Sequence, residues 1–265
     1  MKRFFLRVWR IILDGVFPAF CIGCKVEGVF LCEECLKMVP RLRGQVCPWC
    51  YRKSEFGAVC ENCVVGGGGV RGDDSARVAA GGRFLDGVLV GSAFEEHSLL
   101  QKAIHQLKYE FVKDLAEPLG QFLTETFLAM VEKNPQQKFI LCPLPLHHKR
   151  LRWRGFNQAE LLCAVAVKWL HQAGYLNVEV QQLLTRVHFS RPQMELTREE
   201  RTLNMKEAFV GLVELVGLHS TASTNTTVVL VDDIATTLST LENAASALKL
   251  AGVREVYSLV LARVF

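Results

Sequence analysis

Two adjacent carboxylates stand between an apolar run and a series of hydroxyl side chains near the end of the chain. In the sequence VVLVDDIATTLST, the apolar residues 228–231 predict a short buried strand, and Asp232 and Asp233 follow it directly. The next residues, LENAASALKLAG, predict a helix with Ser239 or Thr240 as its N-cap. Backbone N–H groups at the start of a helix bind anions, and carboxylates accept hydrogen bonds from sugar hydroxyls. The order of strand, acids, hydroxyl loop and helix therefore predicts a site for a phosphorylated sugar.

The same stretch resembles the motif with which type I phosphoribosyltransferases bind 5-phosphoribosyl 1-pyrophosphate (PRPP). In that family the acid pair holds the ribose 2′ and 3′ hydroxyls, and the following loop holds the 5′-phosphate. The resemblance implies the PRPP-binding residues Asp232, Asp233, Ala235, Thr236, Thr237, Leu238, Ser239 and Thr240. The family usually has glycine where this chain has Leu238, and a leucine held in the left-handed region costs about 1–2 kcal/mol. The alternative is a strand whose end merely caps the next helix.

Cysteine spacing gives a second chemical signal. Eight of the ten cysteines form four Cys-x-x-Cys pairs: Cys21 and Cys24, Cys32 and Cys35, Cys47 and Cys50, Cys60 and Cys63. Four thiolates make a closed tetrahedral zinc site, so the pattern predicts about two structural Zn²⁺ ions in a small ribbon module. Sequential pairing is favoured, with interleaved pairing left open. Disulfides, which suit exported chains, and a redox pair, which usually occurs singly, are the alternatives.

Positive charge gathers after a second predicted strand at 138–147. Four cations fall within six residues, with Trp153 between them: Lys149, Arg150, Arg152 and Arg154. An electropositive loop at the carboxyl end of a strand suits a pyrophosphate or a nucleic-acid backbone. A solvated basic turn is the alternative. A helix at about 157–171 is predicted to follow.

The elements that must position these groups are predicted from apolar periodicity. Strands are expected within 84–94 and at the end of the chain, and two helical segments within 97–133. Lys108, at the end of the first segment, can reach a phosphate or lie in solvent, where it suits the helix dipole. Cys142 and Cys163 stand in apolar surroundings and are predicted to lie in the core.

Several separate motifs resemble the ComF family of competence proteins. They are the FPxxCxxC start at 17–24, LKY at 107–109, RGFNQ at 154–158, the segment 184–209, and VDDIATT at 231–237. The resemblance implies an α/β fold: a zinc-ribbon module fused to a type I phosphoribosyltransferase-like parallel sheet flanked by helices. It also implies a role in natural transformation, acting on incoming single-stranded DNA at the cytoplasmic side.

The chain has 265 residues, 50% of them hydrophobic, and a net charge of +4, which supports one good core with a small appendage. Residues 1–65 are predicted to hold an N-terminal helix and the double zinc ribbon, 66–82 a glycine-rich linker, and 83–265 the phosphoribosyltransferase-like domain. The amphipathic segment 3–13 is expected to pack on the next domain, with a membrane-surface position as the alternative. Segment 186–208 is predicted to be either a lid or a surface helix.

Three functions from different classes fit these patterns. The first is a cytoplasmic accessory protein of DNA uptake, at the inner face of the membrane or away from it. It would bind single-stranded DNA, carry a PRPP-like pocket and contact other DNA-uptake proteins. The second is an active phosphoribosyltransferase, in which the basic segment steadies pyrophosphate and Mg²⁺ arrives with PRPP. The third is a structural zinc-ribbon adaptor.

Overall fold

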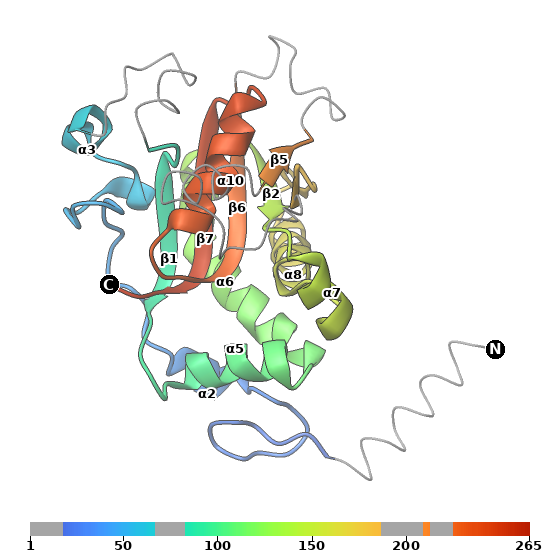
Figure 1. Cartoon of the computed structure of the whole chain (residues 1–265). Helices are drawn as coiled ribbons and strands as arrows, with labels where there is room; N and C mark the ends of the chain where they lie inside the picture. Colours follow the sequence, from blue (N-terminus) through green and yellow to red (C-terminus); the bar gives the residue numbers. More distant parts are fainter. Residues whose placement is uncertain (1–17, 67–82, 187–208, 213–224) are drawn as a thin grey trace.

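A parallel β-sheet of five strands forms the centre of the molecule, in the spatial order β1-β7-β6-β2-β3 (Figure 1). The computed structural model describes residues 18–66, 83–186, 209–212 and 225–265. The strands are β1 (Gly87–Ala93), β2 (Lys138–Pro143), β3 (Val178–Val180), β6 (Thr226–Ala235) and β7 (Glu255–Arg263). Every neighbouring pair runs parallel. The predicted α/β class with a parallel sheet flanked by helices is therefore confirmed.

Several sequence predictions lie outside the described residues. These are the amphipathic helix at 3–13, the glycine-rich linker after residue 66, and the segment at 186–208 beyond its first residue. The division into 1–65, 66–82 and 83–265 accordingly stays a prediction.

Helices pack on both faces of the sheet. In the described parts of the chain they are α2 (Glu33–Lys37), α3 (Glu61–Gly66), α5 (Leu99–Tyr109), α6 (Ala116–Lys133), α7 (His148–Arg154), α8 (Gln158–Gln172) and α10 (Ser239–Leu250). Short 3-10 turns are η1 (Glu55–Gly57) and η2 (Lys113–Leu115). A separate antiparallel pair joins β4 (Leu184–Arg186) to β5 (Phe209–Gly211).

Alternation along β6 divides the core into two layers. Val229 and Val231 join a hydrophobic cluster with residues of α5, α6 and α8, whereas Val228 and Leu230 join a second cluster with α10. This is the period of two that a strand buried on both faces requires. Figure 1 shows α10 over one face of β6 and β7, with α6 and α8 on the other. The predicted core residues Cys142 and Cys163 are buried, one in each cluster.

Four predicted features differ from the structure. Strand β2 ends at Pro143, whereas the predicted strand runs to residue 147. Strand β6 continues through both aspartates to Ala235, because its pairing with β7 extends that far. Helix α10 begins at Ser239 with Leu238 as its N-cap, so neither Ser239 nor Thr240 is the cap. The basic segment is the short helix α7 rather than a loop, because Gly155 in the left-handed conformation ends one helix before α8 begins.

The cysteine-rich segment packs directly against the sheet domain. Helix α2 contacts α6, and Leu36 and Val39 are buried in the same hydrophobic cluster as α5 and α6. Further on, Leu42 N–H donates to Gly91 O at 2.9 Å. The Gln45 side chain donates to Val90 O at 3.0 Å and accepts from Val90 N–H at 2.9 Å. The segment is therefore hydrogen-bonded along the outer side of β1.

Glycine 57 permits the closest part of this contact. An ideal Cβ at this position would lie 2.0 Å from Val88 O, and Gly57 has φ +69. Any other residue would therefore push the 3-10 turn η1 away from β1 and strain its own backbone.

Among the described residues, no helix is long and apolar enough to cross a membrane.

Candidate functional site

The cysteines of the four Cys-x-x-Cys pairs form two separate clusters. The first contains Cys21, Cys24, Cys32 and Cys35, and the second contains Cys47, Cys50, Cys60 and Cys63. Within each cluster the four Sγ atoms lie within 4.8 Å of one another. This confirms sequential pairing over the interleaved alternative. All ten cysteines of the chain are free, so the disulfide alternative is not adopted.

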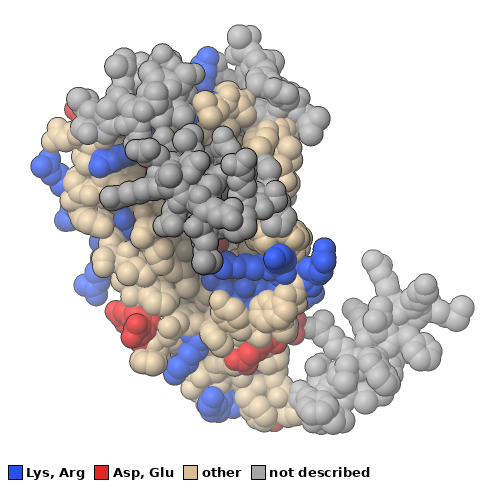
Figure 2. Space-filling model, viewed as in Figure 1, with Lys and Arg blue, Asp and Glu red and all other residues tan. Residues whose placement is uncertain are grey.

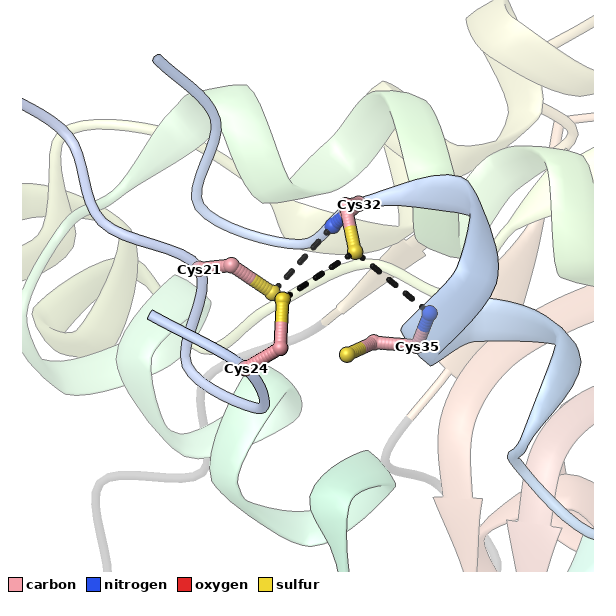
Figure 3. Close-up of side chains that lie close together, drawn as sticks. All are labelled: Cys21, Cys24, Cys32 and Cys35. Carbon is pink, nitrogen blue, oxygen red and sulfur yellow. Dashed lines mark hydrogen bonds between the residues drawn. The ribbon is translucent and has the colours of Figure 1, made fainter. Parts of the chain in front are cut away.

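The sulfur positions fit a tetrahedral metal site. Cys24 Sγ lies 3.6 Å from Cys32 Sγ, and Cys50 Sγ lies 3.5 Å from Cys60 Sγ. A tetrahedron of sulfurs at about 2.3 Å from a zinc ion has edges of about 3.8 Å. Figure 3 shows the four side chains of the first cluster pointing toward one another, with Cys35 on α2. Both clusters could hold a metal ion with no open coordination position.

The thiols within each cluster differ in acidity. Burial raises the pKa of Cys21, but backbone N–H groups, led by that of Cys32, outweigh burial and bring this pKa to about 6. Burial and the neighbouring thiols raise the pKa of Cys35 to about 12. The second cluster repeats this division, with the pKa of Cys47 at about 6 and that of Cys63 at about 12. Four thiolates side by side need a cation, and metal binding would release the remaining protons.

Gly23 is a residue that the sequence analysis missed. An ideal Cβ at position 23 would lie 2.6 Å from Cys35 Sγ, which is closer than real Cβ atoms come to sulfur. The turn between Cys21 and Cys24 therefore needs glycine to let the fourth sulfur approach. The sequence signal was the glycine inside the first Cys-x-x-Cys pair. The spacing of the cysteines does not show that Cys35 Sγ lies against this glycine.

The two acids lie at the carboxyl end of β6 but not on one side of it. Asp232 pairs with Val260 of β7 in the ladder, so the strand is regular at this point. Successive side chains of a strand point to opposite faces of the sheet, so the carboxylates of Asp232 and Asp233 lie on opposite faces at this edge. Their backbones remain linked, since Asp233 N–H donates to Asp232 Oδ1 at 2.8 Å.

Asp233 is paired with a lysine that is distant in the sequence. Lys108 Nζ, in the last turn of α5, lies 2.5 Å from Asp233 Oδ1. The two side chains are 17% and 4% exposed, so this is a largely buried ion pair. The alternative that Lys108 lies in solvent is wrong, because the lysine is largely buried against a carboxylate. Its contact with a phosphate stays a prediction. The second oxygen, Asp233 Oδ2, is buried without a hydrogen-bond partner among the described residues.

Asp232 lies in different electrostatic surroundings. Burial, followed by the negative charge of Asp233, raises the pKa of Asp232 to about 7. Arg186, at the end of β4, is close enough to Asp232 for their charges to interact. Burial and the charge of Arg150 lower the pKa of Arg186, while Asp232 acts in the opposite direction. Asp232 therefore changes its charge close to neutral pH.

The hydroxyl loop ends in a strained residue. Leu238 has φ 62 and ψ −5, a left-handed conformation that the family's usual glycine would adopt without steric strain. Its side chain is buried in the cluster beneath α10 and is not directed into the loop. Thr236 and Thr237 are exposed, and Thr237 Oγ1 lies 2.9 Å from Ser239 Oγ. Leu238 makes no side-chain cap, so the first N–H groups of α10 have no capping side chain.

Helix α7 divides the predicted basic residues into two kinds. Lys149, Arg150 and Arg152 are exposed, whereas Arg154 is only 7% exposed. Figure 2 shows Lys and Arg side chains gathered on the face of the molecule that carries α7. Three of the four cations are therefore exposed, and their contact with pyrophosphate or nucleic acid stays a prediction. The fourth cation, Arg154, is buried.

Arg154 faces the acid pair. Burial lowers the pKa of Arg154, and the charge of Asp233 acts in the opposite direction. The guanidinium donates to the Gln158 side chain and lies 5.7 Å from the ring centroid of Tyr109. Its Nε is buried without a hydrogen-bond partner in the described parts of the chain. Asn157 fixes this region to the sheet, since its side chain donates to Leu144 O at 3.0 Å just beyond β2.

The carboxyl edge of the sheet thus gathers groups from four parts of the sequence. They are Lys108 from α5, Arg150 and Arg154 from α7, Arg186 from β4, and the acids of β6. The cysteine clusters are built by the N-terminal segment and are separate in sequence from this edge. An edge that combines carboxylates, buried cations and uncapped helix N–H groups can bind a ligand with both hydroxyl and anionic groups.

The chain is similar to several proteins of known name. It is 30% identical to Competence protein F of Haemophilus influenzae over 177 residues, which cover 66% of this chain and 72% of that protein. It is 24% identical to Competence protein ComFC of Bacillus subtilis over 221 residues, covering 82% of this chain and 77% of that protein. It is 33% identical to DNA utilization protein YhgH of Salmonella typhimurium over 150 residues, covering 56% of this chain. No protein-family model matches the sequence.

Fold and site together define an α/β protein with a five-stranded parallel sheet and two four-cysteine clusters packed beside it. The chain belongs to the ComF family of competence proteins, as the sequence motifs predicted. Its match spans 60% of the length of the Salmonella relative, so that protein's activity is not transferred directly to this chain.

Proposed function

We propose that this chain is an accessory protein of DNA uptake that binds single-stranded DNA and carries a pocket for a sugar phosphate such as PRPP. The names of its relatives refer to competence and DNA utilization, which supports the first part. The observation that carries the proposal is the cation-lined carboxyl edge of the sheet. There buried Arg154 adjoins Asp232 and Asp233, and exposed Arg150 lies near Arg154 and Arg186.

The pocket is supported by buried polar atoms that have no hydrogen-bond partner within the described parts of the chain. Asp233 Oδ2 can accept a hydrogen bond from a ribose hydroxyl, and Arg154 Nε can donate one to a phosphate oxygen. The first N–H groups of α10 and the hydroxyls of Thr236, Thr237, Ser239 and Thr240 would hold the 5′-phosphate. Mg²⁺ would enter with PRPP, bound mainly through oxygen atoms of the ligand.

DNA binding is supported by the exposed part of α7. Lys149, Arg150 and Arg152 stand on one short helix, and none of these three has an ion pair in the described structure. A row of unpaired cations attracts a phosphate backbone through counterion release. The two cysteine clusters would each hold a structural Zn²⁺, keeping the N-terminal segment folded against the sheet.

The DNA test is a titration of the full chain with a single-stranded oligonucleotide at several salt concentrations. Replacing Lys149, Arg150 and Arg152 together by Ala should weaken binding and reduce the slope of log affinity against log salt by about 2, or about 0.7 per contact. The matched control is the triple replacement of Lys37, Lys133 and Lys168 by Ala, which removes equal charge from ion-paired positions elsewhere. Equal slopes for the two triple variants, or no binding by wild type at low salt, would contradict the DNA role.

The pocket test is calorimetry with ribose 5-phosphate and, separately, with PRPP and Mg²⁺. Asp233→Asn should weaken both interactions about 10-fold or more, because a charged acceptor is lost from a buried hydrogen bond. Replacement of Thr236 and Thr237 by Val provides a second variant that leaves the Lys108 ion pair intact. Wild type that binds neither ligand would contradict the pocket and leave the DNA role standing.

Phosphoribosyl transfer is a second candidate, favoured by Arg154 as a buried cation beside the acid pair. In that function Arg150, Arg152 and Arg154 would steady the departing pyrophosphate. Release of pyrophosphate from PRPP upon addition of an acceptor would support this activity, and tight PRPP binding without release would count against it.

A further inference from the structure

Three aromatic side chains meet at the surface where α5 and α7 come together. The ring of Trp153 lies 5.1 Å from that of Phe111 and 6.2 Å from that of Tyr109. Trp153 is 57% exposed, Tyr109 50% and Phe111 41%. The contacts between these rings help to hold α7 against the end of α5. Even so, large parts of three neighbouring aromatic residues face solvent, and such grouping usually marks a binding surface.

The backbone at Phe111, which carries one of these rings, is conformationally strained. Phe111 has φ 59, the left-handed conformation that a bulky residue rarely adopts. This residue follows Glu110, the C-cap of α5, at a position where a glycine would avoid the strain. Strained non-glycine residues persist where the surrounding structure requires the side chain in that place. With its backbone in this left-handed conformation, Phe111 has its ring beside that of Trp153.

The aromatic group is continuous with the basic face of α7. Residues three and four positions apart on a helix are neighbours, so Arg150 and Lys149 lie on the same side of α7 as Trp153. The guanidinium of Arg154 lies 5.7 Å from the ring centroid of Tyr109. Cations that track a phosphate backbone beside exposed aromatic faces form the arrangement on which single-stranded nucleic acids bind without sequence preference. A neutral protein partner would gain nothing from the cations.

We propose that Tyr109, Phe111 and Trp153 form a base-stacking platform, on which bases of a single-stranded DNA lie while Lys149, Arg150 and Arg152 contact its phosphates. This inference rests on the proposed DNA function and adds how the strand is held. Stacking is tolerant of sequence, because every base has an aromatic face. The platform therefore distinguishes a single strand, whose bases are free, from a duplex, whose bases are stacked on one another.

The test compares two oligomers of equal charge, oligothymidine and the same length of abasic deoxyribose phosphate, binding to the full chain. Wild type should prefer oligothymidine by about 5- to 100-fold, the effect of stacking one base. Trp153→Ala should lose this preference while keeping the salt slope, because no charge is removed. Trp153→Phe should retain most of the preference and lose the quenching of tryptophan fluorescence that oligothymidine produces in wild type.

Leu151→Ala is the matched control, since Leu151 is an exposed apolar residue of the same helix that carries no ring. It should bind both oligomers as wild type does. Equal affinity of wild type for the two oligomers, or an unchanged preference in Trp153→Ala, overturns the platform and leaves the DNA role in place. Wild type that binds neither oligomer overturns the DNA role itself, and the platform with it.

Discussion

Lys108 Nζ and Asp233 Oδ1 lie 2.5 Å apart, joining the end of α5 to the end of β6 across 125 residues of sequence. The pair neutralises a carboxylate that would otherwise be buried alone. It also leaves the other oxygen, Asp233 Oδ2, buried and without a hydrogen-bond partner among the described residues. A ligand that hydrogen-bonds to Asp233 would therefore find a carboxyl group that Lys108 already holds in place.

Lys108→Met should lower the free energy of unfolding by about 3 kcal/mol, because removal of one partner leaves a buried charge uncompensated. We take the low end of the usual range since the lysine is 17% exposed. Urea denaturation measures the change. Lys102→Met, at an exposed position of the same helix, is the control and should have little effect. Similar losses in the two variants would show that the ion pair does not stabilise the fold.

The charge of Asp232 should make stability depend on pH. Its pKa is about 7 in the folded chain against 3.8 as a free side chain, so over this window the folded state holds a proton that the unfolded state releases. Stability should therefore fall as pH rises through the window and level off above about 7. The neighbouring charges are Asp233, Lys108 and Arg186.

Asp232→Asn keeps the size of the side chain and removes its titration. The gain in unfolding free energy of this variant over wild type should grow between about pH 5 and pH 8. Because both proteins contain the same cysteine clusters, acid effects on those clusters cancel in the difference. A gain that stays constant across the range would show that Asp232 does not titrate there.

Leu238→Gly exchanges strain for a cavity. Relief of the left-handed conformation gains about 1–2 kcal/mol, and loss of a buried leucine side chain costs about 2–5 kcal/mol. The variant should therefore be less stable than wild type by about 1–3 kcal/mol. Leu238→Ala makes nearly the same cavity and keeps the strain, so it should be less stable than Leu238→Gly. The reverse order in urea denaturation would mean that the conformation at this position is not strained.

The full chain should contain two zinc ions, one for each cluster. Cys32→Ser and Gly23→Ala should each contain one, because the first change removes a ligand and the second places a methyl group against Cys35 Sγ. Cys142→Ala, at a buried position outside both clusters, should keep two. Elemental analysis of the purified proteins gives the numbers. Wild type without metal, or Cys32→Ser with two ions, would contradict the assignment.

Local patterns predicted the fold well. The apolar run at 228–231, the Cys-x-x-Cys spacing and the two helical segments within 97–133 all appear in the structure as expected. Each depends on residues close together in sequence, where period and spacing fix the geometry. The parallel sheet was implied by the resemblance to the ComF family, and the structure contains it.

Other features depended on contacts that no local pattern contains. Arg154 was grouped with three exposed cations, yet the structure buries it, because α7 turns this one position toward the acids. The partner of Lys108 lies 125 residues away. The role of Gly57 is set by a carbonyl of β1 that approaches it from another segment. Such pairings are decided by tertiary packing, so they could not be predicted from one sequence.

The hydrogen bonds from Leu42 and Gln45 to β1 have a further consequence. β1 is the first strand of the sheet, and on its outer side these bonds occupy polar groups that would otherwise be free to recruit another strand. The residues that supply them stand next to the second cysteine cluster, which begins at Cys47. Chelation or oxidation of that cluster would therefore do more than unfold a small segment. It would expose the unpaired backbone groups of the edge strand β1, so metal-depleted protein should self-associate before its central sheet unfolds.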